Sequence, residues 1–309
     1  LVDVSWVGPA QRNALVRLAH YSTRIEGNPL TLPEVQALAE GKDLSVEEMA
    51  KREVLNYLAA LRWIWQKSPV RIAEKGLLHL HALLTRGILP HEQVGDYKRR
   101  SNAVFSQGRI LYKPPPPEAA PILTQAFLRW LHSKKTEAED PVVVSAVAHH
   151  RLVSIHPFMD GNGRAARTLA SWILYRREFD TQHIFALDEF FEADRPRYYA
   201  EIQRVRKGEE ELTPWLEYVG EGIVATLEKT QRRVQTLRVK PTAAMRILLN
   251  RQQERILRIL GEVPRMPGGD LSRTMNLSRA QVSKLMRPLL AAGLVAKEGS
   301  TRAAMYRLP

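Results

Sequence analysis

Apolar side chains recur every three or four residues through most of the first 228 positions, the spacing at which a helix buries one face. The first such stripe ends at Gly27-Asn28-Pro29, which is typical of a helix end, and consists of Leu15, Leu18, Ala19, Ser22 and Glu26. The same spacing predicts helices around residues 54–65, 75–85, 119–132, 141–155, 164–176 and 198–221. The pattern therefore predicts a mainly α-helical protein.

One short segment has the pattern of a β-hairpin. Residues 103–106 and 110–112 read as strands, joined through Gln107-Gly108-Arg109. Pro114–Pro117 follow, and four consecutive prolines cannot continue a ladder or a helix. We therefore expect a small hairpin followed by an extended segment.

The C-terminal segment has the pattern of three short helices, predicted over residues 252–260, 271–275 and from Ser278 toward Ala292. Asp270 and Ser278 are placed to cap the second and third of these helices. Pro288 should end or kink the third helix, and Gly293 should end it.

A turn at Asn276-Leu277 separates the last two predicted helices. Residues 294–297 and 304–308 then predict a second hairpin around Gly299. Helix, helix–turn–helix and hairpin in that order form the outline of a winged helix-turn-helix module.

Charge divides the chain in the same place. The whole chain carries a formal net charge of +13, and residues 229–309 hold 17 Lys and Arg against 4 Asp and Glu. The first 228 residues are therefore balanced, and the entire excess lies in the last quarter. This marks a boundary near Lys229 and gives the tail a surface suited to phosphate.

The overall composition is that of a globular protein, with 44% hydrophobic and 26% charged residues. No stretch approaches the roughly 18 apolar residues of a membrane span, and no signal peptide is visible. The absence of cysteine excludes disulfides and thiolate metal sites. We expect a cytoplasmic protein with no membrane partner.

The segment from His156 to Arg167 concentrates groups that suit a phosphate ligand. Gly161, Asn162 and Gly163 can adopt positive-φ conformations that turn backbone N–H groups toward one anion, and a helix begins directly afterwards. Arg164 and Arg167 share a face of its first turn, where cations are unfavourable unless an anion is bound.

Two further side chains complete the predicted site. Asp160 is the carboxylate of the cluster and is placed to hold Mg²⁺ against phosphate oxygens, while His156 is the candidate general base. A metal-dependent hydrolase built on His149, His150 and His156 is disfavoured, because these histidines lack a second carboxylate at ligand spacing. The parts together favour phosphoryl-type transfer.

The string His156-Pro157-Phe158-Met159-Asp160-Gly161-Asn162-Gly163-Arg164-Ala165-Ala166-Arg167 resembles the Fic signature HPFx(D/E)GNGRxxR at every fixed position. The resemblance covers residues 10–225 or so. It implies an ATP-dependent protein adenylyltransferase, which moves AMP from ATP to a Ser, Thr or Tyr hydroxyl of a protein, including itself. ATP with Mg²⁺ and a target protein are the implied partners.

The resemblance also assigns roles to the loop residues. His156 would deprotonate the target hydroxyl, which attacks the α-phosphorus, and Asp160 would hold Mg²⁺. Gly161, Asn162 and Gly163 would bind the phosphates together with Arg164 and Arg167. Phe158 would anchor the loop in the core.

Two neighbouring features also resemble parts of this family. The turn Ser106, Gln107, Gly108 and Arg109 resembles the flap, whose edge accepts an extended target segment by strand addition. Tyr198, Tyr199 and Arg206 resemble the adenine-binding residues, although many relatives have Asn in place of Arg206. Plain core packing is the alternative for both tyrosines.

Glu26 is unusual on physical grounds alone, since a carboxylate at a helix C-terminus on the inward face needs a cationic partner. Ser22-Thr23-Arg24-Ile25-Glu26-Gly27 resembles the inhibitory pattern (S/T)xxxE(G/N), in which that partner is the second loop arginine, here Arg167. The resemblance implies a self-inhibited enzyme in which Glu26 and Ser22 occupy the arginine that binds the γ-phosphate.

In the tail, Ser278, Arg279, Gln281 and Lys284 fall at the start of the predicted recognition helix, and Arg302 falls on the wing. Such side chains reach base edges and phosphates, so DNA is the favoured partner. The rival uses are a homodimer contact or the presentation of target proteins.

We therefore expect an N-terminal helical region with the inhibitory helix over residues 1–80, a Fic-type helical core with a small β-hairpin flap over 81–228, and a winged helix-turn-helix over 229–309. The leading function is autoinhibited protein adenylylation. The alternative is a DNA-binding regulator whose Fic domain senses nucleotide without turnover. A kinase, as in the related Doc proteins, is disfavoured because their loop has Lys in place of Gly163.

Overall fold

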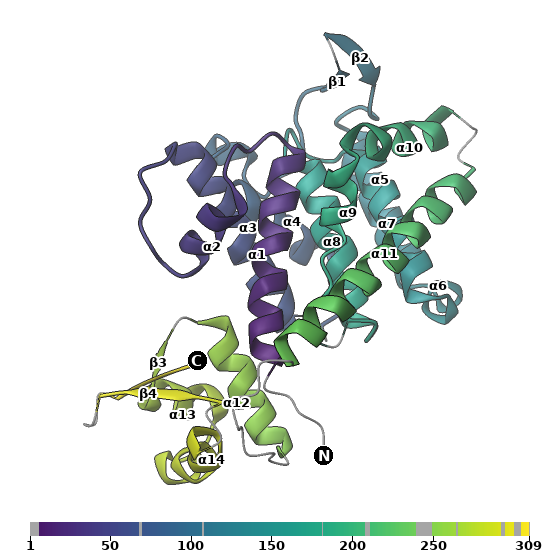
Figure 1. Cartoon of the computed structure of the whole chain (residues 1–309). Coiled ribbons are helices and arrows are strands. Elements are labelled where there is room, and N and C mark those ends of the chain that lie inside the picture. The colour runs from purple at the N-terminus through teal and green to yellow at the C-terminus, as the bar shows by residue number, and fades with distance from the viewer. Residues whose placement is uncertain are drawn as a thin grey trace. The chain divides into compact units, whose positions relative to one another are not determined.

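The computed structural model describes residues 6–67, 70–106, 108–180, 182–207, 211–238, 249–263, 265–291, 294–299 and 304–308 (Figure 1). The chain divides into two compact units. One comprises residues 15–228, and the other comprises residues 229–309 with the start of the chain through Ala14. The boundaries fall within two helices, α1 and α11.

Helices make up most of the unit formed by residues 15–228, as the periodicity predicted (Figure 1). They are α1 (Val7–Ile25), α2 (Leu32–Ala39), α3 (Glu48–Lys67), α4 (Glu74–Thr85), the 3-10 turn η1 (His91–Gln93), α5 (Ala119–Leu131), α6 (Lys134–Ala138), α7 (Pro141–Ile155), α8 (Asn162–Arg176), α9 (Asp188–Ala193), α10 (Arg195–Lys207) and α11 (Thr213–Arg238).

Helices α7 and α8 lie together at the centre of this unit, with α3 and α4 against α8 and α5 against α7. Small side chains such as Ala148, Ala165 and Ala166 are fully buried, which lets the two helix backbones approach closely. Asp140 caps α7 by accepting a hydrogen bond from Val142 N, with Pro141 in the first turn. The loop that connects α7 to α8 is therefore fixed at both ends by well-packed helices.

The single helix predicted around residues 198–221 is wrong. The structure has two helices instead, since α10 ends at Lys207 and α11 begins at Thr213. Pro214 lies in the first turn of α11, where its missing N–H does no harm, but its ring would clash with a preceding helical turn. A proline at this position starts a new helix rather than continuing the old one.

The predicted hairpin is present as β1 (Val104–Ser106) and β2 (Arg109–Tyr112), which pair antiparallel with Val104 opposite Tyr112 and Ser106 opposite Arg109. Gly108 has a φ of 74°, the left-handed conformation that glycine adopts readily. The Phe105 and Ile110 side chains are exposed. The Tyr112 hydroxyl donates to Ser154 O at 2.8 Å, which ties β2 to the last turn of α7.

The tail has the predicted winged helix-turn-helix outline. Its elements are α12 (Arg251–Glu262), β3 (Met266–Pro267), α13 (Gly268–Met275), α14 (Arg279–Ala291), β4 (Ala296–Glu298) and β5 (Met305–Arg307). The strands form an antiparallel sheet in the order β3-β5-β4. Ile256, Leu271, Val282, Met286 and Leu289 belong to a separate apolar core. Strand β3 was not predicted, because two residues carry no alternation.

One prediction about the tail helices is wrong. Asp270 does not cap α13, which begins at Gly268, so that Asp270 lies inside the first turn and pairs with Arg273. Pro288 lies inside α14 and does not end it, because the helix continues to Ala291, and the predicted kink stays a prediction. The predicted cap at Ser278 is confirmed, since Ser278 Oγ accepts from the backbone N–H of Gln281. Gly293 lies outside the described residues.

No helix within the described ranges combines the length and apolar character that a membrane crossing requires.

Candidate active site

The loop from His156 to Gly161 connects α7 to α8 and starts with a strained residue. His156 ends α7 with φ 50° and ψ 56°, in the left-handed region that non-glycine residues rarely adopt. Its Nδ1 lies 3.2 Å from Val153 O. Because a carbonyl oxygen only accepts, Nδ1 carries the proton and Nε2 keeps its lone pair. The imidazole is therefore set in the tautomer that a general base requires.

The charge state of His156 agrees with that role. Burial lowers its pKa to about 4, the positive charges of Lys98 and Arg206 act in the same direction, and the Val153 carbonyl opposes them in part. At neutral pH the ring is uncharged and can accept a proton.

The turn that was predicted to bind phosphate differs in detail from that prediction. Positive φ occurs at Gly161, with a value of 75°, but not at Asn162 or Gly163, which form the first turn of α8. Asn162 uses its side chain to close the loop, accepting from Phe158 N at 3.0 Å and donating to Phe158 O at 2.9 Å. Only the backbone of Asn162 is left to face an anion.

Gly163 is required for space rather than for its backbone angles. A Cβ atom at this position would collide with the Glu26 carboxylate and would lie 3.2 Å from Arg167 Nη1. The absent side chain thus admits a carboxylate to the N-terminus of α8, where the helix dipole favours negative charge.

Arg164 and Asp160 lie side by side at the loop, one buried and the other exposed. Arg164 is buried and lies 3.4 Å from both the Asp160 and the Glu53 carboxylate oxygens. The Asp160 side chain is 63% exposed. Its carboxylate is therefore open to solvent beside the loop, as a ligand for Mg²⁺ must be.

Arg167 lies at the centre of a buried network, and the predicted pair with Glu26 is present. Arg167 Nη2 donates to Glu26 Oε1 at 2.7 Å and to Ser22 O at 2.9 Å, while Nε donates to Ser22 Oγ at 2.8 Å. Burial alone would raise the pKa of Glu26, but the charges of Arg167 and Arg164 outweigh it and hold this pKa below its usual value.

Asp188, at the start of α9, is a second buried carboxylate on Arg167 that the sequence did not reveal. Its Oδ1 lies 3.1 Å from Arg167 Nε, and its side chain is 3% exposed. Burial raises the pKa of Asp188 although the charge of Arg167 opposes the shift. The available signal was an acid among Phe185, Leu187 and Phe191, but acids at a helix start are common enough to hide it.

The three residues predicted for an adenine pocket take different positions. Tyr198 is buried in the core, with its hydroxyl 2.9 Å from His149 Nε2 and 3.4 Å from Arg167 Nη1. Its ring is therefore not open for stacking. Tyr199 is half-buried and donates to Ile25 O at 3.3 Å. Arg206 donates to Val153 O at 2.8 Å and lies over the Tyr112 ring.

His150, in α7, and Phe158, in the loop, both belong to the core. His150 is buried with its Nε2 3.2 Å from Ile202 O, and Phe158 is fully buried as predicted. Within the described part of the chain no three His, Asp or Glu side chains gather as a metal cluster.

The flap and tail residues are exposed where they are described. Arg109 begins β2, while Gln107 and Arg302 lie outside the described residues. Ser278, Arg279 and Lys284 are exposed at the start of α14, as is Gln281, but its Oε1 accepts from Ser278 N at 2.9 Å. Gln281 is thus partly committed to the helix cap.

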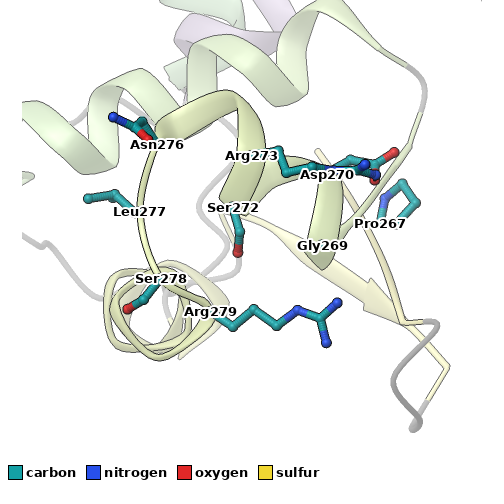
Figure 2. Close-up of a pocket in the computed structure, with 9 residues that line it drawn as sticks. All are labelled: Pro267, Gly269, Asp270, Ser272, Arg273, Asn276, Leu277, Ser278 and Arg279. Carbon is teal, nitrogen blue, oxygen red and sulfur yellow. The ribbon is translucent and has the colours of Figure 1, made fainter.

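A pocket lies between α13 and the start of α14. Figure 2 shows Arg279 extending beside Gly269, with Arg273 next to Asp270. The residues that line it are Pro267, Gly269, Asp270, Ser272, Arg273, Asn276, Leu277, Ser278 and Arg279.

Comparison with known proteins agrees with both units. Residues 71–174 match the model of the Fic/DOC family, and residues 249–296 match that of winged helix-turn-helix DNA-binding domains. This chain belongs to the Fic family. The protein adenylyltransferase Fic of Drosophila melanogaster is 30% identical over 225 residues, which cover 71% of this chain and 42% of that protein. The chain thus spans less than half the length of this relative.

Solved structures support the fold. A Fic family protein from Desulfovibrio desulfuricans has a TM-score of 0.64 at 23% identity and covers 97% of this chain and 87% of its own. Fic-1 from C. elegans, residues 134–508, has a TM-score of 0.58 at 25% identity and covers 73% of this chain and 64% of its own.

Proposed function

We propose that this Fic protein transfers AMP from ATP to a hydroxyl group of a protein. The observation that carries the proposal is a neutral His156, with its proton on Nδ1, directly before a helix N-terminus that holds a buried arginine. A base, an anion site and a guanidinium within one loop and one helix turn are what an in-line attack on a nucleotide phosphate needs.

In this proposal His156 Nε2 takes the proton of the target hydroxyl as the oxygen attacks the α-phosphorus. The bond from that phosphorus to the bridging oxygen of the β-phosphate breaks, and pyrophosphate leaves. Gly161 and the first N–H groups of α8 face the phosphates. Arg164 and Arg167 supply positive charge, and Arg167 binds the γ-phosphate once it is free of Glu26.

Asp160 fits a role in holding Mg²⁺. Magnesium in nucleotide sites commonly takes one or two carboxylates and completes its shell with phosphate oxygens and water, and Asp160 supplies one exposed carboxylate on the loop. The ion would neutralise charge on the phosphates.

Glu26 would keep the enzyme in a restrained state. The carboxylate lies over Gly163 and accepts from Arg167, so it occupies the charge and the space that a γ-phosphate needs. Ser22 holds the same guanidinium from the preceding turn of α1. Release of Glu26 is therefore the step that admits ATP productively.

The tail would bind duplex DNA through Arg279, Lys284 and the start of α14, in keeping with its family match and its charge. These features also support a second candidate, a DNA-binding regulator whose Fic domain senses nucleotide without turnover.

Intact-mass spectrometry after incubation with ATP and Mg²⁺ tests the proposal. AMP transfer adds the mass of one AMP residue to the chain or to an added protein, in Glu26→Gly more than in the wild type. Bound nucleotide without any covalent adduct in either protein would instead support the sensor, and an adduct of the mass of phosphate would indicate a kinase.

A further inference from the structure

The backbone carbonyls of the catalytic loop are held from outside the loop, one after another. Pro157 O accepts from Lys98 N at 2.9 Å, and Phe158 O and Met159 O accept from Asn102 Nδ2 at 2.9 and 3.3 Å. These donors come from the connection between η1 and β1, which the motif does not include.

Lys98 is a cation in an unusual place. It is 2% exposed, and the acceptor recorded for its Nζ within the described residues is Asn102 Oδ1, at 3.0 Å, with no carboxylate at ion-pair distance. Burial lowers the pKa of Lys98 to about 8. A buried ammonium is unfavourable unless it is used, so its place beside this loop needs an explanation.

The chemistry of the two side chains supplies that explanation. An ammonium group only donates, so it can face only the oxygen end of the Asn102 amide. The Nδ2 end is then forced toward the loop, where both of its contacts are carbonyl oxygens. Lys98 therefore selects one of the two orientations of the amide.

The loop needs such support because His156 is strained. A non-glycine residue in the left-handed region is unfavourable and persists only where its surroundings hold it. The carbonyl contacts begin at Pro157, the next residue. Without them the backbone could relax and carry Nε2 away from the position it now occupies.

We propose that Lys98 and Asn102, here called the loop brace, are positioning residues that hold His156 in register for AMP transfer. The expected effect on AMP transfer rests on the proposed function, whereas the contacts of the loop brace with the loop do not depend on it. It acts on the chemical step more than on ATP binding, because neither side chain belongs to the predicted phosphate site.

The test uses the full chain with Glu26→Gly as the parent, and four variants of it: Asn102→Leu, Lys98→Met, the double variant Lys98→Met/Asn102→Leu, and Lys98→Arg. Arg100→Ala, an exposed neighbour in the same connection, is the matched control. Three quantities are measured: the self-modification rate at saturating ATP, the ATP concentration for half this rate, and amide hydrogen exchange of residues 157–161.

Asn102→Leu and Lys98→Met should each lower the saturated rate by roughly tenfold or more, since a displacement of about 1 Å at a reacting group can cost about a hundredfold. The half-saturating ATP concentration should stay within about twofold, and loop exchange should become faster. The double variant should be no worse than Asn102→Leu, because the two residues act as one unit. Lys98→Arg should keep most of the saturated rate of the Glu26→Gly parent.

The proposed brace would be wrong if Asn102→Leu left both the self-modification rate and the amide exchange of the loop unchanged. It would also be wrong if the rate losses of the two single variants multiplied in the double variant. If Asn102→Leu does not fold, the contrast between Lys98→Met and Lys98→Arg decides in its place. If the parent modifies nothing, the proposed function fails, and loop exchange alone decides on the brace.

Discussion

Replacing Glu26 with glycine should activate the enzyme, and the structure indicates by how much. Glu26 Oε1 lies 2.7 Å from Nη2 of a fully buried Arg167, whereas its own side chain is 31% exposed. A hydrogen bond between charged groups contributes about 1.5–3 kcal/mol. At 1.4 kcal/mol for each factor of ten, the loss of this bond should raise the fraction of enzyme in which Arg167 is available to the γ-phosphate by about tenfold to a hundredfold.

The guanidinium should stay in place after this change. Arg167 Nε donates to Ser22 Oγ at 2.8 Å, and Asp188 Oδ1 lies 3.1 Å from the same nitrogen as a buried counter-charge, both independently of Glu26. The activated variant therefore keeps an ordered γ-phosphate ligand.

The assay measures the initial rate of self-modification with subsaturating ATP and Mg²⁺, detected as label from the α-phosphate that becomes bound to the protein. Glu26→Gly should exceed the wild type by about tenfold to a hundredfold. Arg24→Gly is the matched control, since it places glycine two residues away at the C-terminal end of α1 and removes the exposed pair with Glu192 rather than the contact with Arg167. It should leave the rate close to that of the wild type. Glu26→Gly/Arg167→Ala should lose the gain.

Equal rates in Glu26→Gly and the wild type, at saturating as well as subsaturating ATP, would show that Glu26 does not restrain the enzyme. A gain of the same size in Arg24→Gly would also contradict such a restraint, because it would attribute activation to a weaker helix rather than to the freed guanidinium.

Three further predictions concern the base and the tail. His156→Ala should lose transfer while its ATP affinity, measured by calorimetry, stays within about threefold of the parent, because the anion site remains. Since burial lowers the pKa of His156 to about 4, the rate at subsaturating ATP should be level from pH 8 down to about 5 and should fall below that, whereas an acid limb centred near 6.5 would contradict the buried base. The affinity of the full chain for duplex DNA should fall steeply with salt, and Arg279→Ala/Lys284→Ala should weaken it and flatten the salt slope; no binding at low salt would favour dimerisation or target presentation.

The local pattern of apolar residues predicted most of the helices. Each of these helices buries one face in a shared core, so the period of its apolar residues indicates where it lies in the chain. The pattern failed where a single proline decides whether a helix continues. Pro214 starts a new helix within a segment whose pattern predicted one helix, and Pro288 lies inside α14 without ending it. A proline near a helix start and one near its end look alike in a pattern, but tertiary packing decides how each is accommodated.

The chemistry of the loop could be predicted because its residues are contiguous, and Glu26 could be predicted because its position at a helix end is unfavourable by itself. Asp188, Lys98 and His81 could not. His81 donates to Asp160 O at 3.0 Å from α4, and its Nδ1 accepts from Gly95 N at 3.0 Å. Such partners are set by how segments distant in the chain pack around the loop, which no local pattern encodes.

In the proposed reaction the α-phosphate, not the γ-phosphate, becomes attached to protein, and His156 is needed for this transfer. The most direct measurement compares ATP labelled at the α- or the γ-phosphorus, incubated with Mg²⁺ and either Glu26→Gly or Glu26→Gly/His156→Ala. We expect protein-bound α-label with Glu26→Gly, no bound γ-label, and neither label with the double variant. Retention of γ-label on the protein, or of α-label without His156, would contradict it.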